Sequence, residues 1–479
     1  MNKKRLNYKK YFLNLVSFIK SSNFSFLYNI PELFIRDFRK DKSNNNKFTS
    51  NFFQGIFDRN IYFKNPNFLE NSKICFISHY VGATNRKNLD YDFYFGNLFK
   101  ILIKENIKFS VILINHTDEK IIDIYKKYKK SKLNRIIINN NFNALRDYKI
   151  LLYIFLKYLE FKLFKTNNNK NLKELIKFKI SLNLKFFLSS KNTIKLTRNI
   201  IKTLNKMTNL QNLITTYEGH AFERILFNYC RKKNIKSFGY FFSVIRNFKN
   251  SIYYNINKNY TPNVVFTSGR VISNNLIKNI KKTSKHIYTL GSSKNLRKSK
   301  IKLLKNKNKK KLKVLVCPEG LYTETKLMMN LVSGLKRNNN IEYIFRTHPV
   351  IDKSVLKKEN YFYKNIKFSN NKNIRKDFDI CDVVLYSGSS VCIQAVLYGL
   401  APIYYHNINY EFSIDPIYEV NKFVVKNKNS LDRILNYFIL NKNNKTLKKK
   451  LINIQNYCSD YFEKLNFKIL LNTLKKHEK

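Results

Sequence analysis

The sequence predicts an α/β protein of two domains, each built on a parallel sheet. Three observations carry this prediction. Short apolar runs typical of buried strands alternate with helical stretches in both halves of the chain. A low-complexity, strongly basic segment, residues 292–311, separates the two halves and is expected to be a linker. The chain has 479 residues, which allows about two or three domains and ample chain for a core.

The N-terminal half opens with a basic, aromatic segment and continues into a strand–helix–strand unit. Residues 1–70 have no small-residue cleavage site, so we interpret them as a basic helical extension rather than a signal peptide. We expect a strand at 73–78, a helix at 93–105 and a second strand at 109–115. These elements begin an N-terminal domain that we place at residues 71–291.

Residues 120–210 are predicted to be a Lys-rich helical insertion in this domain. Its most apolar piece, residues 148–164, also carries charged side chains and is therefore amphipathic rather than membrane-spanning. A core-facing helix is the favoured interpretation, and a basic patch on a membrane surface is the alternative. Further short strands are expected at 213–216, 237–241, 264–267 and 287–290.

The C-terminal half repeats the alternation. We place a second domain at residues 312–430 and helices at 431–479. The strands expected in this domain are 313–317, 342–346, 382–386 and 400–404, with helices at 324–337 and 391–398. Ligands of parallel sheets bind outside the carboxyl ends of the strands. Most polar motifs of this chain follow a strand directly, and this coincidence is the main functional signal.

The charge is strongly positive, with 91 Lys and Arg against 31 Asp and Glu and a net charge of +60. A polyanionic partner and a biased amino-acid usage both explain such an excess. The 91 basic residues include only 17 Arg, and the remaining 74 Lys are spread almost evenly. Phosphate-reading surfaces favour Arg. We therefore favour biased usage together with a tendency to bind anionic surfaces, and we disfavour nucleic acid as a partner.

The cysteines and the hydropathy pattern indicate a cytoplasmic protein. None of the six cysteines belongs to a C-x-x-C pair, which is typical of reduced, buried thiols. No apolar run reaches the ~18 residues that span a bilayer. The expected location is the cytoplasm, with the inner face of the cytoplasmic membrane as a candidate anionic partner surface for a peripheral protein.

In the C-terminal half, the turn Ser387-Gly388-Ser389-Ser390 lies between a strand and a helix. Free N–H groups, serine hydroxyls and the close backbone approach that Gly388 allows make this turn a candidate phosphate site. The alternative is an ordinary serine helix cap.

Four further residues accompany this turn at strand ends or on the next helix. His348, followed by proline, and Arg346 are expected to donate to a phosphate. Glu319 follows the first strand of this half and is a candidate ligand of a ribose or base. Gln394 lies one turn into the helix after the serine turn and either faces a ribose or faces solvent.

In the N-terminal half, the motif Tyr-Glu-Gly-His at residues 217–220 follows a strand. Glu218 is the candidate general base in a chain poor in acids, and His220 is the alternative. Glu223 and the arginine after it are expected to pair or to cap the following helix. A polar loop after the first strand, with Gly82 and Thr84, is a candidate for contact with the acceptor.

The order of these motifs resembles a known group of enzymes. Along residues 71–430 the chain carries four features in this order: a carboxylate–Gly motif, a basic linker, a His-Pro motif and a Ser-Ser pair that opens a helix. This layout resembles the GT-B glycosyltransferases that use CMP-activated acidic sugars: bacterial sialyltransferases, polysialyltransferases and Kdo-type capsule transferases. It is also similar to surface carbohydrate biosynthesis proteins. The resemblance implies two Rossmann-like domains that face each other across a cleft.

The resemblance also implies roles for individual residues. Glu218 corresponds to the catalytic base, and His348, Ser389 and Ser390 correspond to the ligands of the CMP phosphate. The chain departs from the family pattern at the base, because it has Tyr-Glu-Gly instead of two acids before the glycine.

The function implied is a glycosyltransferase of capsule, lipopolysaccharide or O-antigen biosynthesis. Its donor is a nucleotide-sugar, with CMP-activated acidic sugars favoured, and its acceptor is a glycan or a lipid-linked glycan. No cofactor and no metal are expected, because the helix dipole and His348 are expected to stabilise the leaving phosphate. The alternatives are a CDP-glycerol-type phosphotransferase or a nucleotide-sugar epimerase on the same fold. Outside enzymes, the alternatives are a basic polyanion-binding protein or a non-catalytic scaffold.

Overall fold

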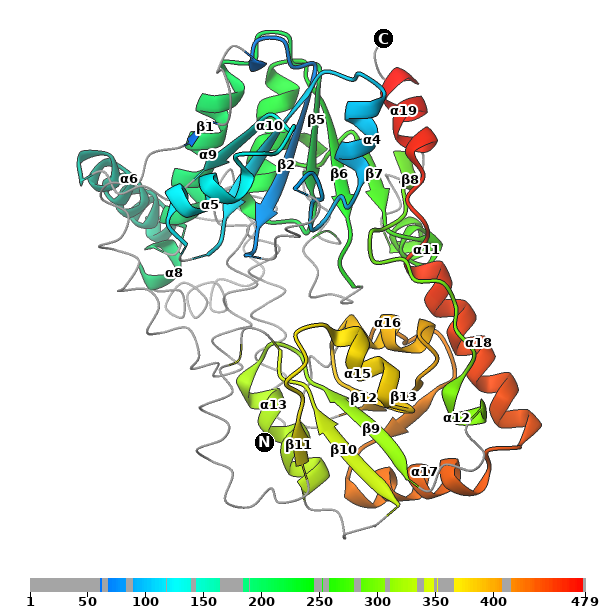
Figure 1. The fold of residues 1–479 in the computed structure, drawn as a ribbon. Coiled ribbons are helices and arrows are strands. Elements are labelled where there is room, and N and C mark those ends of the chain that lie inside the picture. Colours follow the sequence, from blue (N-terminus) through cyan, green and yellow to red (C-terminus); the bar gives the residue numbers. More distant parts are fainter. Residues whose placement is uncertain are drawn as a thin grey trace.

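The computed structural model shows two α/β domains, one stacked on the other (Figure 1). It describes residues 61–62, 68–82, 89–117, 119–138, 144–163, 184–188, 190–244, 252, 258–279, 286–305, 311–333, 340–348, 351, 366–406 and 415–476. The predicted basic extension lies outside the described residues except for 61–62 and 68–70.

The N-terminal domain contains an eight-stranded sheet of order β1-β4-β3-β2-β5-β6-β7-β8. All neighbouring strands are parallel except β1 and β4, which are antiparallel. The strands are β1 (Ile61–Tyr62), β2 (Ile74–Tyr80), β3 (Phe109–Asn115), β4 (Arg135–Ile138), β5 (Asn212–Thr216), β6 (Lys236–Phe241), β7 (Val264–Thr267) and β8 (Ile287–Thr289). The central strands are nearly continuous apolar runs because helices cover both faces of the sheet.

Alternate side chains of β2 build the two cores of this domain. On one face Phe76 contacts Phe95 and Phe99 edge-to-face, with ring centroids 5.3 and 5.0 Å apart. On the other face Cys75 and Ile77 pack against α9 and α10. The helices are α4 (Leu98–Lys104), α5 (Ile121–Tyr128), α6 (Ala144–Leu163), α8 (Leu184–Leu188), α9 (Lys191–Leu204), α10 (Ala221–Lys232), the 3₁₀ turn η7 (Lys258–Tyr260) and α11 (Arg270–Asn279).

The C-terminal domain contains a fully parallel six-stranded sheet of order β11-β10-β9-β12-β13-β14. Its strands are β9 (Leu312–Cys317), β10 (Ile341–Phe345), β11 (Ile366–Phe368), β12 (Val383–Tyr386), β13 (Ala401–Tyr405) and β14 (Phe423–Val425). Its helices are α12 (Lys302–Lys305), α13 (Tyr322–Ser333), α15 (Ile374–Ile380), α16 (Val391–Leu397) and α17 (Lys428–Leu440). In both sheets the strand order reverses at a central pair, β2/β5 and β9/β12. Such a switch point is where parallel sheets bind ligands.

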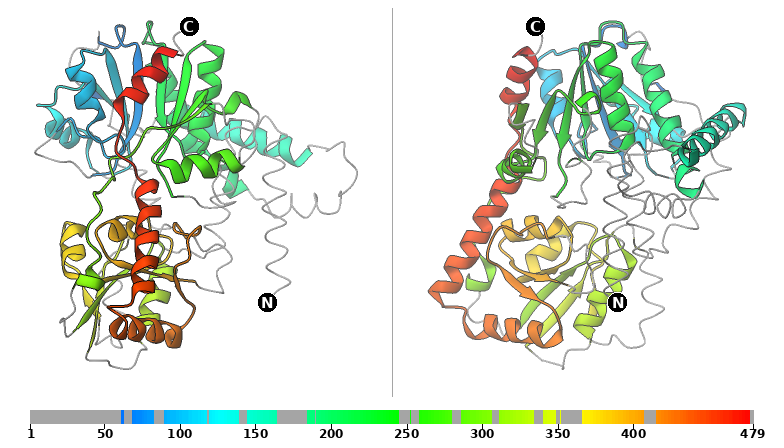
Figure 2. Two further views of the ribbon diagram at one scale, coloured as in Figure 1. Left: turned by 90° about the vertical axis from the view of Figure 1, so that its right-hand side faces the viewer. Right: turned by 180° about the vertical axis from the view of Figure 1, so that it is seen from behind.

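The C-terminal helices join the two domains. Helix α18 (Lys445–Tyr461) runs from the C-terminal domain up to the N-terminal one, and α19 (Phe467–Lys476) lies beside the N-terminal sheet (Figure 2). Leu470 and Leu474 of α19 are buried in the core around β2. Within the described residues 431–476 the segment holds the rest of α17 and the helices α18 and α19, and its last helix packs on the N-terminal domain.

The two-domain α/β prediction is confirmed, and the structure adds short strands that the sequence did not indicate. Strand β4 lies inside the segment 120–210, which was predicted to be mostly helical. The three-residue strands β11 and β14 flank the second sheet. The described part of the basic linker is bonded to the C-terminal domain, since the Ser299 and Lys302 amides donate to the carbonyls of Leu397 and Gly399 at 2.9 and 2.8 Å. Within the described residues, no helix is both long enough and apolar enough to cross a bilayer.

Candidate functional site

A pocket of about 520 Å³ lies at the carboxyl edge of the N-terminal sheet. The ends of β2, β3 and β5 and the helices α9 and α10 line it. Its polar lining includes His79, His116, Glu218, His220 and Glu223. This edge of the sheet points toward the C-terminal domain, and the carboxyl edge of the second sheet points back at it (Figure 1).

Glu218 and His220 face each other in this pocket. The Glu218 Oε2 atom lies 3.1 Å from His220 Nε2, and about one third of each side chain is exposed. Gly219 between them has a φ of +84°, so the turn uses the backbone freedom of glycine. A carboxylate and an imidazole in contact, both open to solvent, are suited to proton transfer.

Glu223 holds the turn in place. Its side chain is fully buried, and its carboxylate accepts hydrogen bonds from the amides of Glu218, Gly219 and His220 at 2.7 to 3.1 Å. Burial raises the pKa of Glu223 to about 7. The prediction that Glu223 caps the helix is therefore confirmed, and Glu223 positions the Glu218–His220 pair.

A chain of two histidines and a threonine lies at the floor of the pocket. His79 Nδ1 is 2.7 Å from His116 Nε2, and His79 Nε2 is 2.8 Å from the Thr216 hydroxyl. Burial lowers the pKa of His79 to about 3 and also lowers the pKa of His116. Both imidazoles are therefore neutral at pH 7. The sequence analysis did not select His116, although its place directly after a buried strand was a signal that could have found it.

Aromatic rings close one side of the pocket. The rings of Tyr94 and Phe242 contact each other edge-to-face with centroids 4.5 Å apart. Lys294, from the segment between the domains, lies over the Phe242 ring with Nζ 5.9 Å from its centroid. Burial lowers the pKa of Lys294, and the charge of Glu218 opposes that shift. The Lys294 amine thus lies near the candidate base.

In the C-terminal domain the loops after β9, β10 and β12 contact one another. A Cβ atom at Gly388 would lie 2.1 Å from Glu319 Oε2, and one at Gly320 would lie 3.0 Å from His348 Nδ1. Burial lowers the pKa of His348, and the charge of Glu319 opposes the shift. Three predicted nucleotide ligands, Glu319, His348 and Gly388, are therefore neighbours at one edge of the sheet.

The serine turn continues this edge. Ser387 and Ser389 are buried, and the Ser389 hydroxyl accepts a hydrogen bond from the Val391 amide at 3.4 Å. Ser390 is the residue before α16, and the half-buried Gln394 lies on that helix.

Arg346 lies in a different network from the one predicted. Its guanidinium forms an ion pair with the buried Asp377 and donates to the Asn371 carbonyl at 3.0 Å. These bonds hold β10 to α15, and a phosphate contact by Arg346 stays a prediction. On the acceptor side, Gly82 follows β2 with a φ of +78°, and Thr84 lies outside the described residues.

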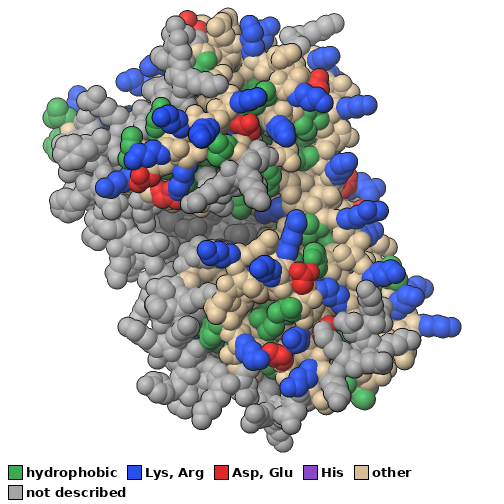
Figure 3. Space-filling view, in the orientation of Figure 1, with side chains coloured by type: hydrophobic (Ala, Val, Ile, Leu, Met, Phe, Trp, Pro, Cys, Tyr) green, Lys and Arg blue, Asp and Glu red, His purple; other side chains and the backbone are tan. Residues whose placement is uncertain are grey.

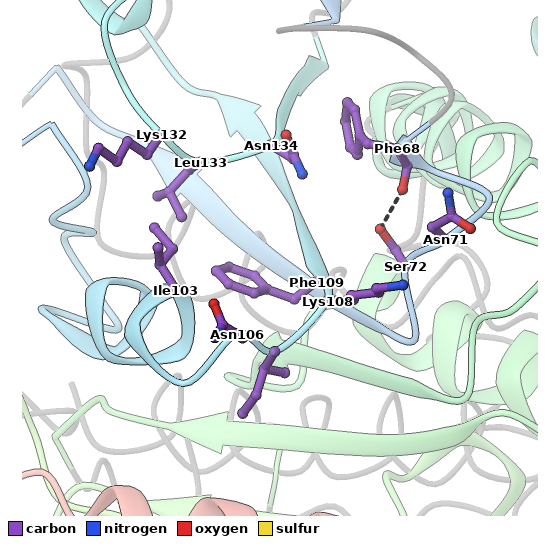
Figure 4. A pocket seen from close by; sticks show the side chains of 11 residues that line it. Phe68, Asn71, Ser72, Ile103, Asn106, Lys108, Phe109, Lys132, Leu133 and Asn134 are labelled. Atoms are coloured by element: carbon purple, nitrogen blue, oxygen red, sulfur yellow. Dashed lines mark hydrogen bonds between the residues drawn. The ribbon is translucent and has the colours of Figure 1, made fainter.

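A second pocket, of about 390 Å³, lies at the opposite edge of the N-terminal sheet (Figure 4). Its lining includes Ser72, Asn106, Phe109 and Asn134, near the amino ends of β2 and β3. It contains none of the predicted site residues and lies away from the switch point, so the first pocket is the candidate site. No group of three or more metal-ligating side chains occurs among the described residues, and metal independence of the reaction stays a prediction.

Comparisons with known proteins assign the fold. No protein-family model and no curated protein matches the chain. A putative UDP-N-acetylglucosamine 2-epimerase from Listeria monocytogenes is similar in structure, with a TM-score of 0.50 and 11% identity over 85% of this chain and 97% of that one. The fold is therefore the two-domain GT-B fold predicted from the sequence, and at this identity the likeness concerns the fold alone.

Two further solved structures resemble the chain. The UDP-GlcNAc 2-epimerase of Methanocaldococcus jannaschii in complex with UDP-GlcNAc and UDP has a TM-score of 0.49 and 13% identity, over 84% of this chain and 99% of that one. Anabaena HepE in complex with UDP has a TM-score of 0.47 and 9% identity, over 84% and 100%.

Proposed function

We propose that the chain is a glycosyltransferase that takes its sugar from a nucleotide-sugar and acts in surface polysaccharide biosynthesis. One observation carries the proposal. Each sheet bears a chemically complementary set of groups at its switch point: a carboxylate–imidazole pair on the N-terminal sheet, and His348, Glu319 and a serine–glycine turn on the C-terminal one. The first set suits proton abstraction and the second suits a nucleotide phosphate.

In this proposal the donor phosphate binds at the C-terminal set. The His348 imidazole donates one N–H to a phosphate oxygen, and the hydroxyls of Ser389 and Ser390 add further donors. Gly388 lets the phosphate approach the backbone closely. These donors stabilise the charge that develops on the leaving phosphate.

The acceptor binds in the N-terminal pocket. Glu218 removes the proton of the acceptor hydroxyl as its oxygen attacks the anomeric carbon. His220, bonded to Glu218, orients the carboxylate, and Glu223 fixes the turn that carries both.

An epimerase that needs no acceptor is the second candidate. It is favoured by the name of the Listeria monocytogenes protein, a putative UDP-N-acetylglucosamine 2-epimerase. The motif resemblance favours a CMP-sugar, whereas the name of that protein refers to a UDP-sugar, so the nucleotide that binds discriminates between the two candidates.

Thermal-shift binding with CMP, CDP, UMP, UDP and GDP tests the donor site. We expect one nucleotide to stabilise the wild-type protein, and His348→Ala to abolish the shift. His286→Ala, at an exposed histidine of the N-terminal domain, is the matched control and keeps the shift. Absence of a shift with every nucleotide overturns the proposal.

Turnover then separates the two enzymes. Nucleotide-sugars that contain the nucleotide found to bind are incubated with the protein, with and without glycan acceptors. Product that forms only with an acceptor supports the transferase, and an epimerised donor without acceptor supports the epimerase. Glu218→Gln is expected to lower the rate by at least about 100-fold, whereas Glu105→Gln, at an exposed position, leaves it unchanged.

A further inference from the structure

Helix α6 carries an unusual concentration of exposed apolar side chains. Of the 18 large hydrophobic side chains exposed among the described residues, eight belong to this single helix. Leu145 and Leu163 at its two ends are 78% and 79% exposed, and Leu156 near its middle is 55% exposed. The helix projects from the side of the N-terminal domain in every view (Figures 1 and 2).

Seven of these eight side chains form a stripe opposite the packed face of the helix, and the eighth, Tyr153, lies to one side of it. Ile150, Ile154 and Phe161 are buried on the side that meets the domain. The outward stripe follows the helical repeat of three and four residues. It consists of Leu145, Tyr148, Leu152, Phe155, Leu156, Leu159 and Leu163. A helix that packs only on its own domain needs no second apolar face, so this stripe indicates a contact outside the domain.

The charges of α6 suit an anionic partner. Lys149 and Lys162 border the stripe on its two sides, by the 3.6-residue repeat. Both acidic residues of the helix are neutralised within the protein. Asp147 is buried and lies 3.1 Å from Lys195 Nζ, and Glu160 forms an ion pair with Lys157.

We propose that α6 binds the surface of an anionic lipid bilayer, with this stripe inserted among the headgroups. The net charge decides between occupants. Two copies of a +60 chain repel each other, whereas an anionic bilayer attracts each copy. Lysines near such a surface are attracted to its negative potential, and Leu, Phe and Tyr are side chains that lie at the boundary of headgroups and acyl chains.

The lipid contact lies close to the candidate active site. Helix α6 is bonded to α9, with Arg146 donating to Asn199 at 2.8 Å. The same α9 lines the pocket with Asn192, Thr193 and Leu196. Helices α6 and α9 therefore connect the lipid surface to the pocket, and a lipid-linked acceptor would reach the pocket past these two helices. This last step rests on the proposed function, and the lipid contact itself does not.

Vesicle flotation of the full chain tests the proposal without any nucleotide or activity. We expect the wild type to float with vesicles of phosphatidylcholine and phosphatidylglycerol, and to stay unbound with phosphatidylcholine alone. The double variant Leu152→Glu/Leu156→Glu is expected to lose binding at least tenfold. The matched control is Leu440→Glu, which places a charge at a leucine 82% exposed on α17 and leaves binding unchanged. Lys149→Glu provides a second variant with weaker binding.

Three outcomes overturn the proposal. Binding that survives in the double variant, or that is equal with uncharged vesicles, shows that the stripe is not an anionic-lipid contact. A concentration-dependent dimer that the double variant abolishes, without vesicle binding, assigns the stripe to a second copy. A large fall in the melting temperature of the double variant but not of Leu440→Glu assigns it to another segment of this chain.

Discussion

Residue 388 shows how one position constrains both stability and the site. Its φ of +73° lies in the left-handed region, where alanine costs about 1–2 kcal/mol relative to glycine. A Cβ atom there would also displace the Glu319 carboxylate, since it would lie 2.1 Å from Oε2. The carboxylate is the end of a flexible side chain and can move, so the backbone dominates the loss of stability.

Gly388→Ala is therefore expected to lower the melting temperature more than Gly388→Asn does. Both substitutions introduce the same Cβ atom, but asparagine tolerates a positive φ. The comparison of the two melting curves checks this. Equal losses in the two variants would assign the cost to the contact with Glu319 instead.

His79 makes stability depend on pH. Its folded-state pKa is about 3, and an unfolded histidine titrates near 6.5. As the pH falls below 6.5 the unfolded chain binds a proton that the folded chain does not, so stability is lost progressively toward pH 3. We expect His79 to account for a loss of about 2 kcal/mol between pH 7 and pH 5.

Thermal unfolding of the wild type and His79→Gln at pH 7 and pH 5 measures this loss. The melting temperature of the wild type should fall more steeply than that of the variant. His286→Ala, at an exposed histidine, is the control and should follow the wild type. If the melting temperatures of the wild type and of His79→Gln fell equally between pH 7 and pH 5, His79 would not be a neutral, buried group in the folded protein.

Most of the candidate site was visible in the sequence because its residues follow strands. Glu218, His348 and Gly388 each stand directly behind an apolar run, and parallel strands bring such ends together. The bonding partners were not visible. The His79–His116 contact joins residues 37 positions apart. Likewise, Arg346 pairs with the buried Asp377. This residue lies on α15, whose short sequence has no clear hydrophobic periodicity.

At the scale of elements, most central strands were predicted, whereas of the four edge strands only β8, expected at 287–290, was. Strands β3 and β7 match their predicted ranges because burial on both faces makes them continuous apolar runs. Strands β11 and β14 are three residues long and lie at or near the sheet edge, so they carry little pattern. The amphipathic pattern of α19 indicated a helix, but a pattern within one helix does not say which domain its apolar face meets.

The end of α18, where the chain turns toward α19, lies in close contact with the backbone at Gly269. A Cβ atom there would lie 2.3 Å from the Asp460 carbonyl oxygen and 2.4 Å from that of Tyr461. Backbone carbonyls at a helix end cannot move without the helix. Gly269→Ala is therefore expected to destabilise the protein by about 3 kcal/mol and to lower its melting temperature.

Ser268→Ala is the neighbouring control for this substitution. It removes one hydrogen bond, from the Ser268 hydroxyl to the Tyr461 carbonyl at 3.3 Å, and is expected to cost about 1 kcal/mol or less. If Gly269→Ala were no more destabilising than Ser268→Ala, the end of α18 would not be packed on this glycine.

At the scale of the whole molecule, one face shows basic charge that is scattered rather than gathered into a stripe. On this face, drawn in Figure 3, Lys and Arg side chains are spread over both domains and outnumber the acidic ones. This distribution agrees with biased usage and with a general attraction to anionic surfaces. The scattered charge does not specify where an anionic bilayer would bind. The apolar stripe of α6 gives the proposed lipid contact a definite position on the molecule.

A net charge of +60 also predicts how stability responds to salt. Like charges held together in the folded chain repel, and salt shortens the range of that repulsion from about 30 Å at 0.01 M to about 3 Å at 1 M. We expect the melting temperature to rise with NaCl and to level off once the screening length falls below the spacing of surface charges, by about 0.3 M. If salt acted instead by strengthening the burial of apolar groups, the melting temperature would keep rising with NaCl concentration. A melting temperature that stays flat or falls across the low-salt range would mean that the lysines are balanced locally by acidic partners. Charge repulsion would then not disfavour a second copy on α6.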